Sequence, residues 1–385
     1  MQHHIIRSAA FFQSAFYANA RDMTPELSET LLLLSTGHLF GLYNPNQVAD
    51  ALGVSKNKLY RDLKEMSLYQ WKSLLVGVSS TIAIGAIRQA ESKSASTQSR
   101  RCITISVDDT NDPRYAKTLS YCYKWWSKGK NCAIKCRNIL AITLKIGGVI
   151  LPLNIRIVSK QGRGNTDKPT CLRTMIAEVL DVFDAQGIDL RKYPITFDSW
   201  YGSKDLIETL LGLGFTCVLV HGKSNYVMEI NGQTAKLSAH KKTVKLLTHQ
   251  WGCDKPVRRF RAKSPTFGEL VLLFFSTHGK TQTMMVFGRP LRTAEILHIW
   301  SQHHGIEQFW RHLKTDLRLS EMSLHHRNGA YGALGVKIIS YLMIQQVSCS
   351  TRLTFHQIKL QLSGERQMLS IISAHFHELN TQKYL

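Results

Sequence analysis

The order of strand-like and helix-like segments after residue 100 constrains the fold of this chain more than any other feature. Cys102–Val107 is rich in β-branched residues and predicts a strand, and Ile139–Ile146 and Val149–Val158 predict two more around Gly147-Gly148. Helices and strands then alternate: a helix over Thr170–Phe183, a strand over Tyr193–Phe197, a helix over Ser203–Leu213 and a strand over Phe215–His221. The order βββαβαβ predicts an α/β fold built on a mixed sheet.

Acidic residues follow two of these strands. Asp108 and Asp109 come directly after the first strand, and Asp198 comes directly after the fourth. Neighbouring strand ends would bring the carboxylates together, and a divalent cation would relieve their repulsion and keep them ionised. Hard oxygen ligands of this kind favour Mg²⁺ or Mn²⁺. For Asp109 or Asp198 taken alone, a turn-forming role at the end of a strand is the alternative interpretation.

A third acidic candidate, Glu307, lies in a segment with helical periodicity from Thr293 to about Leu317. At about 100° per residue, one stripe of this helix would be polar or aromatic: Trp300, His303, Glu307 and Lys314. Another side would be apolar and would pack on the sheet: Ile299, Ile306, Phe309 and Leu313. The polar stripe is therefore expected to be reachable, although a solvated helix surface without a function also explains each residue alone, His303 above all.

The first hundred residues have mainly helical patterns. Among them, Gln47–Leu63 has the composition of a helix-turn-helix, in which Gly53 permits the turn and Ser55 caps the second helix. The second helix carries three basic residues that would face DNA phosphates: Lys56, Lys58 and Arg61. An ordinary helical hairpin is the alternative. Glu91–Arg101 is rich in polar and basic residues and predicts a linker, which places a domain boundary near residue 100.

The charge balance favours a polyanionic partner. Lys and Arg number 49 against 27 Asp and Glu, for a formal charge of +22. Because the basic residues are spread along the chain rather than gathered on one amphipathic helix, nucleic acid is favoured over a membrane surface. The longest apolar run, Leu270–Phe275, is too short to span a bilayer, so no transmembrane segment is expected. The eight cysteines are scattered, which favours reduced thiols in a cytoplasm.

Residues 222–292 interrupt the α/β pattern with short β-like runs, Lys241–Leu247 and Leu270–Phe275, and predict an inserted β-rich module. The module contains 13 Lys and Arg against 3 Asp and Glu, so we expect it to cover the carboxylates and to contact phosphates. Its candidate contacts are three arginines and one tryptophan: Arg258, Arg259, Arg261 and Trp251. Trp251 would stack on a base displaced from the duplex, or else fill the core of the module.

Together, these motifs resemble those of the DDE transposases of bacterial insertion sequences, in the group whose third carboxylate lies in a Tyr-x2-Arg-x3-Glu-x6-Lys signature. Asp109-Thr110 resembles the first acidic motif, Phe197–Gly202 the second and Ile306–Lys314 the third. The spacing, the Glu and the Lys agree, while Trp300 and His303 stand where the family has Tyr and Arg. The β-rich module is similar to that of the family, and the likeness covers roughly residues 100–345.

The resemblance implies an RNase H-like catalytic core that cleaves DNA at transposon ends and transfers the cut strand into target DNA. It implies two Mg²⁺ or Mn²⁺ ions per active site, bound by Asp109, Asp198 and Glu307, a phosphate contact by Lys314, base stacking by Trp300 and a hydrogen bond from His303 to the DNA. Asp108 is the alternative first ligand, because strand alternation points only one of the two adjacent carboxylates into a site.

The expected organisation follows from these assignments. A helical DNA-binding domain spans 1–100, the RNase H-like core spans 101–221 and 293–349, the basic insertion spans 222–292, and a helical C-terminal tail spans 350–385. The expected partners are the terminal inverted repeats and target DNA, both double-stranded, and a second copy of the chain in a synaptic homodimer, at the nucleoid in a bacterial cytoplasm. Two other interpretations stay open: a metal-dependent nuclease or resolvase on the same fold, and a helix-turn-helix regulator with an inactive catalytic domain.

Overall fold

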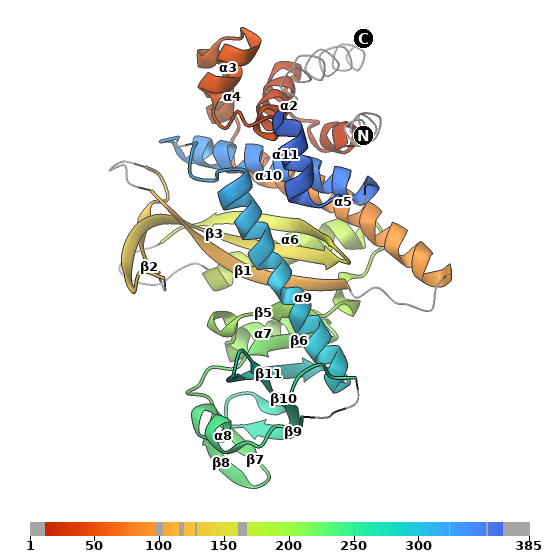
Figure 1. Cartoon of the computed structure of the whole chain (residues 1–385). Helices are drawn as coiled ribbons and strands as arrows, with labels where there is room; N and C mark the ends of the chain where they lie inside the picture. The colour runs from red at the N-terminus through yellow and green to blue at the C-terminus, as the bar shows by residue number, and fades with distance from the viewer. Residues whose placement is uncertain are drawn as a thin grey trace.

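One mixed β-sheet runs through much of the length of the molecule (Figure 1). A computed structural model describes residues 12–96, 103–114, 119–127, 129–160, 168–248, 250, 252–322, 324–351 and 353–364. Among these residues, eleven strands form the sheet in the order β2-β3-β1-β5-β6-β11-β10-β9-β7-β8, with β4 paired to β3. The bounds of the strands are β1 Ile103–Pro113, β2 Tyr123–Ser127, β3 Cys132–Ile146, β4 Val149–Val158, β5 Ile195–Phe197, β6 Cys217–His221, β7 Val227–Ile230, β8 Gln233–Lys236, β9 Val257–Ser264, β10 Gly268–Thr277 and β11 Lys280–Gly288.

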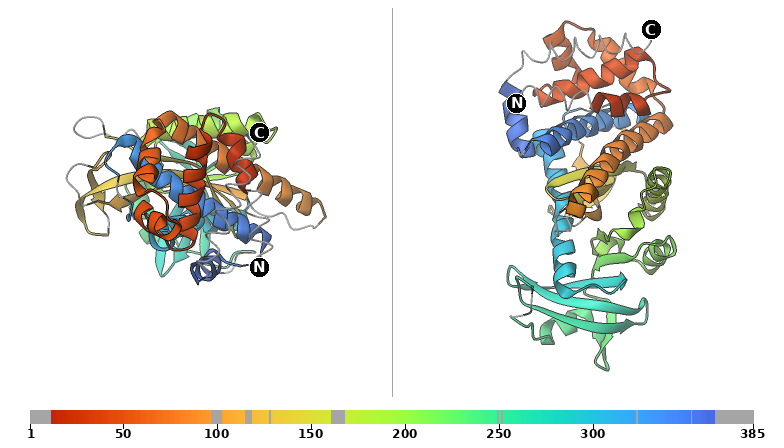
Figure 2. Two further views of the ribbon diagram at one scale, coloured as in Figure 1. Left: turned by 90° about the horizontal axis from the view of Figure 1, so that it is seen from above. Right: turned by 90° about the vertical axis from the view of Figure 1, so that its right-hand side faces the viewer.

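Helices cover the sheet and gather at the end opposite to the insertion (Figure 2). Helices α5 and α6 pack on β3 and β4, α9 crosses β1 and β5, and α10 contacts α2, α4 and α5. The bounds of the helices are α2 Pro25–Leu39, α3 Pro45–Leu52, α4 Lys56–Glu65, α5 Leu68–Ser96, α6 Lys168–Asp184, α7 Lys204–Gly212, α8 Leu237–Thr243, α9 Thr293–Arg311, α10 Arg327–Ser350 and α11 Phe355–Gly364. Three shorter turns are η1 Leu190–Lys192, η2 Ser199–Tyr201 and the π-helical η3 His312–Asp316.

The strand and helix order of residues 103–221 confirms the expected mixed α/β fold. Strands β1, β3 and β4 are antiparallel neighbours, and β5 and β6 then add in parallel to β1. Gly147, with a φ of 59°, and Gly148 form the two-residue turn between β3 and β4, as their sequence predicts. Because β1 lies between an antiparallel and a parallel neighbour, it occupies the centre of this part of the sheet.

Strand β1 is longer than the β-branched run that predicted it. It continues through Asp108 and Asp109 to Pro113, and its whole length pairs with β3. The expectation that these two carboxylates follow the strand is therefore wrong, because pairing with the long strand β3 extends β1 beyond its apolar part. Asp198 does follow β5 directly, as expected. Strand β2, at the edge of the sheet, was not predicted.

The insertion continues the sheet instead of folding apart from it. Strand β11 pairs with β6, and β10 and β9 follow. Lys241–Leu247 is not a strand, because Leu237–Thr243 forms helix α8 and only Leu247 makes an isolated bridge, to Val257. Strands β5 and β6 separate the insertion from β1, so its described strands extend the sheet and do not roof the carboxylates of β1.

The segment predicted as a helix-turn-helix forms two short helices joined by a turn, as an ordinary helical hairpin also would. Asn44 caps α3, Gly53 ends it in the left-handed conformation with a φ of 67°, and α4 begins three residues later. Ser55 precedes α4 but makes no side-chain capping hydrogen bond, contrary to expectation. The predicted linker is also wrong over its first half, because α5 continues through Ser96. The proposed domain boundaries at residues 100, 221, 292 and 349 stay predictions.

Helix α5 is apolar because it is a helix of the core. Its stretch Leu68–Ser92 is long and apolar enough to cross a membrane by length and composition, with a mean hydropathy of 1.3. However, 61% of the most apolar stretch of this helix is buried inside the molecule, where α5 packs against β4, α6 and α10. Such burial accounts for the composition without a bilayer.

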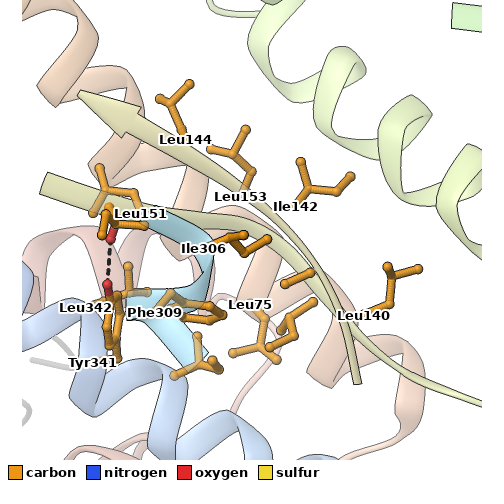
Figure 3. Close-up of a cluster of buried hydrophobic side chains, with 14 of the residues drawn as sticks. Leu75, Leu140, Ile142, Leu144, Leu151, Leu153, Ile306, Phe309, Tyr341 and Leu342 are labelled. Carbon is orange, nitrogen blue, oxygen red and sulfur yellow. Dashed lines mark hydrogen bonds between the residues drawn. The ribbon is translucent and has the colours of Figure 1, made fainter. Parts of the chain in front are cut away.

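A buried hydrophobic cluster fixes α9 to the sheet (Figure 3). Ile306 and Phe309 of α9 lie in this cluster with side chains from β3, β4, α5 and α10, and Phe309 meets the Tyr341 ring edge to face at 4.9 Å between centroids. The Tyr341 hydroxyl donates to the Ile150 carbonyl at 2.9 Å. At Gly305 the helix comes close to β3 and β4, since a Cβ there would lie 2.8 Å from Lys145 Cδ and 3.4 Å from a side-chain carbon of Ile150. Packing thus holds the helix that carries Glu307 against the sheet.

Candidate active site

The two adjacent carboxylates of β1 lie on opposite faces of the sheet. On one face, Ser106 Oγ lies 3.0 Å from Thr196 Oγ1, which lies 2.9 Å from Nδ1 of His303 on α9. Asp108 is two residues beyond Ser106 in an unbroken strand and therefore shares this face. Asp109 points the other way, toward α6 and η2.

Asp108 lies among the other acidic candidates. It is partly buried, and this burial raises its pKa to about 8, with further contributions from the carboxylates of Asp109, Asp198 and Glu307. The interactions with Asp198 and Glu307 mean that residues from β1, the end of β5 and α9 are brought near one another, although 109 positions separate the last two in the sequence. A cation at this face would relieve the repulsion.

Asp198 and Glu307 are exposed, and they lie at the start of η2 and on α9. Asp198 caps η2, where its Oδ1 accepts a hydrogen bond from the Trp200 backbone N–H at 2.8 Å. Glu307 lies two residues after the close crossing at Gly305, and its Oε2 is 3.4 Å from His304 Nδ1. Both carboxylates therefore have oxygens that solvent, DNA or an ion can reach.

Asp109 already has three partners from the protein. Its Oδ2 accepts hydrogen bonds from Lys168 Nζ at 2.8 Å and Asn138 Nδ2 at 2.6 Å. Its Oδ1 accepts one from the Tyr201 hydroxyl at 2.5 Å. An ion pair and two further hydrogen bonds satisfy this carboxylate in the way expected of a structural group.

The helical stripe predicted around Glu307 is only partly correct. His303 is buried, with 5% of its surface exposed, and it stacks on Trp300 with 4.6 Å between ring centroids. Burial lowers the pKa of His303 to about 3, so the ring is neutral and its Nδ1 contacts Thr196. The expected contact of His303 with DNA is therefore not supported, since the close packing of α9 on the sheet covers this side chain. Trp300 is half-buried between His303 and His221.

Lys314 lies in the π-helical turn η3, where a helical wheel of about 100° per residue no longer applies. Its side chain is exposed. Partial desolvation lowers the pKa of Lys314, while the carboxylates of Asp112 and Asp108 act in the opposite direction. These interactions put the ammonium group of Lys314 on the same face as Asp108, next to the acidic cluster.

A family model described as "Transposase DDE domain" matches residues 103–343, which is more than half of the chain and contains all of these residues. The chain belongs to this family. Its mixed sheet with flanking helices is thus the RNase H-like fold of a DDE transposase. No curated protein matches the sequence closely enough to be counted as a relative. DDE transposases cut and transfer DNA and use divalent metal ions, so DNA is the substrate class of this chain.

The residues of the transposase fit a divalent metal ion in their chemistry. Asp108, Asp198 and Glu307 offer carboxylate oxygens, which are the donors that Mg²⁺ and Mn²⁺ prefer. Within the part of the chain that the structure describes, no three His, Cys, Asp or Glu side chains lie close enough to hold an ion as they stand. The fit therefore rests on the donor type and on the shared face of the sheet.

The candidate phosphate-binding residues of the transposase differ in their exposure and in their contacts within the protein. Lys56 and Arg61 are exposed on α4, and Lys58 is half-buried there. In the insertion, Arg261 is exposed, whereas Arg259 donates to the Leu291 carbonyl at 2.7 Å and Arg258 lies over the Phe260 ring at 5.7 Å. Trp251 lies outside the described residues. Arg259 thus has a structural partner that its sequence position did not indicate.

Sequence reasoning missed a buried ionic network beside the site. Arg114 pairs with Asp112 at 2.6 Å and donates to the carbonyls of Leu319, Ser320 and Met322. The Ser320 hydroxyl donates to the second oxygen of Asp112, also at 2.6 Å. This network anchors the segment after η3 to the end of β1 and so holds Lys314 near Asp108. The available signal was the unbroken polar run Asp108–Asp112, beyond the apolar part of β1.

Proposed function

We propose that this transposase cleaves DNA at the ends of a bacterial insertion sequence and joins the cut strand to target DNA, with Asp108, Asp198 and Glu307 as the metal-binding set. One observation carries the proposal: Asp108 lies on the face of the sheet covered by α9 and interacts with Asp198 and Glu307, while Asp109 is bound on the opposite face by Lys168, Asn138 and Tyr201. We therefore assign the role of first ligand to Asp108 rather than to Asp109.

The residues of the chain have separable roles in this proposal. Two bound Mg²⁺ or Mn²⁺ ions supply activation of water or a 3′-hydroxyl and neutralisation of the leaving oxygen. Asp198 is held as the cap of η2, and Glu307 is held on α9, which the buried residues Ile306 and Phe309 attach to the sheet. Lys314 donates to a phosphate oxygen beside the scissile bond. His303 stays neutral and, through Thr196, supports the strand pair beneath Asp108.

The remaining assignments belong to the same proposal. The exposed basic residues of α4 bind the terminal inverted repeats, and two copies of the chain form the synaptic complex, at the nucleoid of a bacterial cytoplasm. Trp300 and His303 replace the Tyr and Arg of the Tyr-Arg-Glu-Lys group. Because His303 is buried, we assign it no DNA contact. Trp300 remains the candidate for base stacking through its exposed part.

The test compares two adjacent residues of the same type. With Mg²⁺ or Mn²⁺ and DNA carrying the ends of the element, we expect cleavage and strand transfer by the wild type. We expect them also from Asp109→Asn, with a loss of no more than about 10-fold, at a temperature where that variant is folded. We expect a loss of at least about 1000-fold in Asp108→Asn, Asp198→Asn and Glu307→Gln, because each removes a charge from the metal-binding set. DNA binding, measured by gel shift, should persist in all four variants.

Other outcomes point to the other interpretations. Cleavage without any joined product would identify a nuclease or resolvase, and sequence-specific binding without cleavage would identify a regulator. If Asp108→Asn cleaves DNA and folded Asp109→Asn does not, the first metal ligand is Asp109.

A further inference from the structure

Three elements meet at Asp109, on the side of the sheet opposite to Asp108. Asn138 comes from β3, Lys168 is the first residue of α6, and Tyr201 is the last residue of η2. Tyr201 has 2% of its surface exposed and Lys168 has 6%. A charged pair in such a place is expensive to desolvate and needs close partners, which these contacts supply.

Aromatic rings hold the Lys168 ammonium group in place. Its Nζ lies 5.0 Å from the centroid of Trp125 and 4.6 Å from that of Trp200, while it donates to Asp109 at 2.8 Å. Trp200 also packs edge to face on Tyr201, with 4.8 Å between centroids. The two rings and the Asp109 carboxylate therefore fix the position of the Lys168 ammonium group.

The turn η2 connects this cluster to the catalytic face. It begins directly after Asp198, which caps it, and it ends at Tyr201. Val107 pairs with Phe197 in the parallel ladder between β1 and β5, so the next residues along the chain are Asp108, still in β1, and Asp198, directly after β5. Asp108 is next to Asp109 in the chain, and Asp198 is three residues before Tyr201. The hydrogen bond from Tyr201 to Asp109 therefore links the two short segments that carry the carboxylates of Asp108 and Asp198.

We propose that Tyr201, together with Asp109 and Lys168, is a positioning device that sets the separation of Asp108 and Asp198. This inference rests on the proposed function, in which those two carboxylates bind the same ion. The ladder between β1 and β5 is short, with three residue pairs, and it ends at Val107 and Phe197. Beyond that point, the Tyr201 hydroxyl ties η2 to β1, and a hydrogen bond to a carboxylate is stronger than one between neutral groups.

The experiment measures metal binding directly and compares two buried tyrosines. Mn²⁺ binding to the full chain without DNA is followed by electron paramagnetic resonance, and thermal unfolding is followed in EDTA. We expect Tyr201→Phe to weaken Mn²⁺ binding about 10-fold, at the low end of the effects of groups that orient metal ligands. Tyr341→Phe loses a similar buried hydroxyl bond, to the Ile150 carbonyl, and should leave Mn²⁺ affinity unchanged.

A second pair of variants tests the lysine. Lys168 and Lys160 both lie over the Trp125 ring, but Lys160 donates to the Lys124 carbonyl and has no contact with Asp109. We expect Lys168→Met to weaken Mn²⁺ binding and Lys160→Met to leave it unchanged. Both should be measured at a temperature where thermal unfolding shows that each variant is folded.

Unchanged Mn²⁺ affinity in Tyr201→Phe would overturn the inference. An equal loss in Tyr341→Phe would also overturn it, because the effect would then be a general loosening of the core. Asp198→Asn separates this failure from failure of the proposed function. If Asp198→Asn binds Mn²⁺ as well as the wild type, the carboxylates are not the metal site; if it loses the ion while Tyr201→Phe does not, only the positioning role is wrong.

Discussion

The two adjacent aspartates of β1 should respond in opposite directions when each is replaced by asparagine, with one variant more stable than the wild type and the other less stable. In the metal-free protein, burial raises the pKa of Asp108 from its usual 3.8 to about 8, which means that the folded state disfavours its charge. Asp108→Asn removes that charge and should stabilise the fold. Asp109→Asn removes the partner of the buried Lys168 ammonium group and should destabilise it.

The pH dependence follows from the direction of the shift. Below pH 4 Asp108 is protonated in both the folded and unfolded states and contributes no pH-dependent difference. Between about pH 4 and pH 8 only the unfolded state releases the proton, so stability falls as pH rises and levels off above pH 8. A pKa raised from 3.8 to about 8 corresponds to a loss of at most about 6 kcal/mol in the free energy of unfolding. Because Asp108 is partly exposed and water screens it, we expect about 1 to 3 kcal/mol.

The assay is urea unfolding in EDTA at pH 5 and pH 8. The advantage of Asp108→Asn over the wild type should be larger at pH 8 than at pH 5. Addition of Mg²⁺ should then stabilise the wild type and not the variant, since an ion that binds only the folded state raises its stability. Asp109→Asn should lose about 3 to 5 kcal/mol, the range for breaking a buried ion pair.

A result in which Asp108→Asn is less stable than the wild type at pH 8 would refute this reasoning. So would a constant difference between the two proteins from pH 5 to pH 8, because the carboxyl would then have no raised pKa in the folded state. If Asp109→Asn proved to be the stabilised variant, the assignment of the two faces of β1 would be reversed.

Three further predictions concern the candidate DNA contacts of α4 and of the insertion. Lys58→Glu on α4 should weaken binding to the terminal repeat and lower the slope of log affinity against log salt by about 1 or more, whereas the exposed Lys204→Glu on α7 should leave that slope unchanged; gel shifts at several salt concentrations decide the matter. In the insertion, Arg261→Ala should reduce the salt dependence of DNA binding without loss of stability. Arg259→Ala should instead cost about 1 to 2 kcal/mol in urea unfolding, because it leaves the Leu291 carbonyl without its donor.

Much of the fold could be predicted from local patterns. The hairpin around Gly147 and Gly148 was predicted because a two-residue glycine turn between apolar runs has few alternatives. Strand β1 was predicted too short, because its second half is polar and becomes a strand only by pairing with β3. Lys241–Leu247 was predicted as a strand because its apolar spacing is ambiguous over a short segment, and the helix α8 forms over its first residues.

In the candidate site, too, the sequence predicted some features and the structure was needed for others. The sequence indicated acidic residues at three places, and the structure brings the regions of β1, β5 and α9 together. It could not indicate that His303 is covered by the crossing of α9 over the sheet, because burial depends on how closely two distant elements pack. Lys168 lies in none of the three acidic motifs, and Tyr201 lies in the second one, but nothing in its position there indicated a bond to Asp109.

By itself, the sequence determined the class of the sheet, the places of the acidic residues and the excess of positive charge, because periodicity, motif spacing and composition are properties of short segments or of the whole chain. Only the tertiary structure decided which of Asp108 and Asp109 shares a face with Glu307. Adjacent residues of a strand point to opposite sides, so the choice depends on which side α9 covers. The packing of Ile306 and Phe309 on the sheet, across many intervening residues, makes that choice.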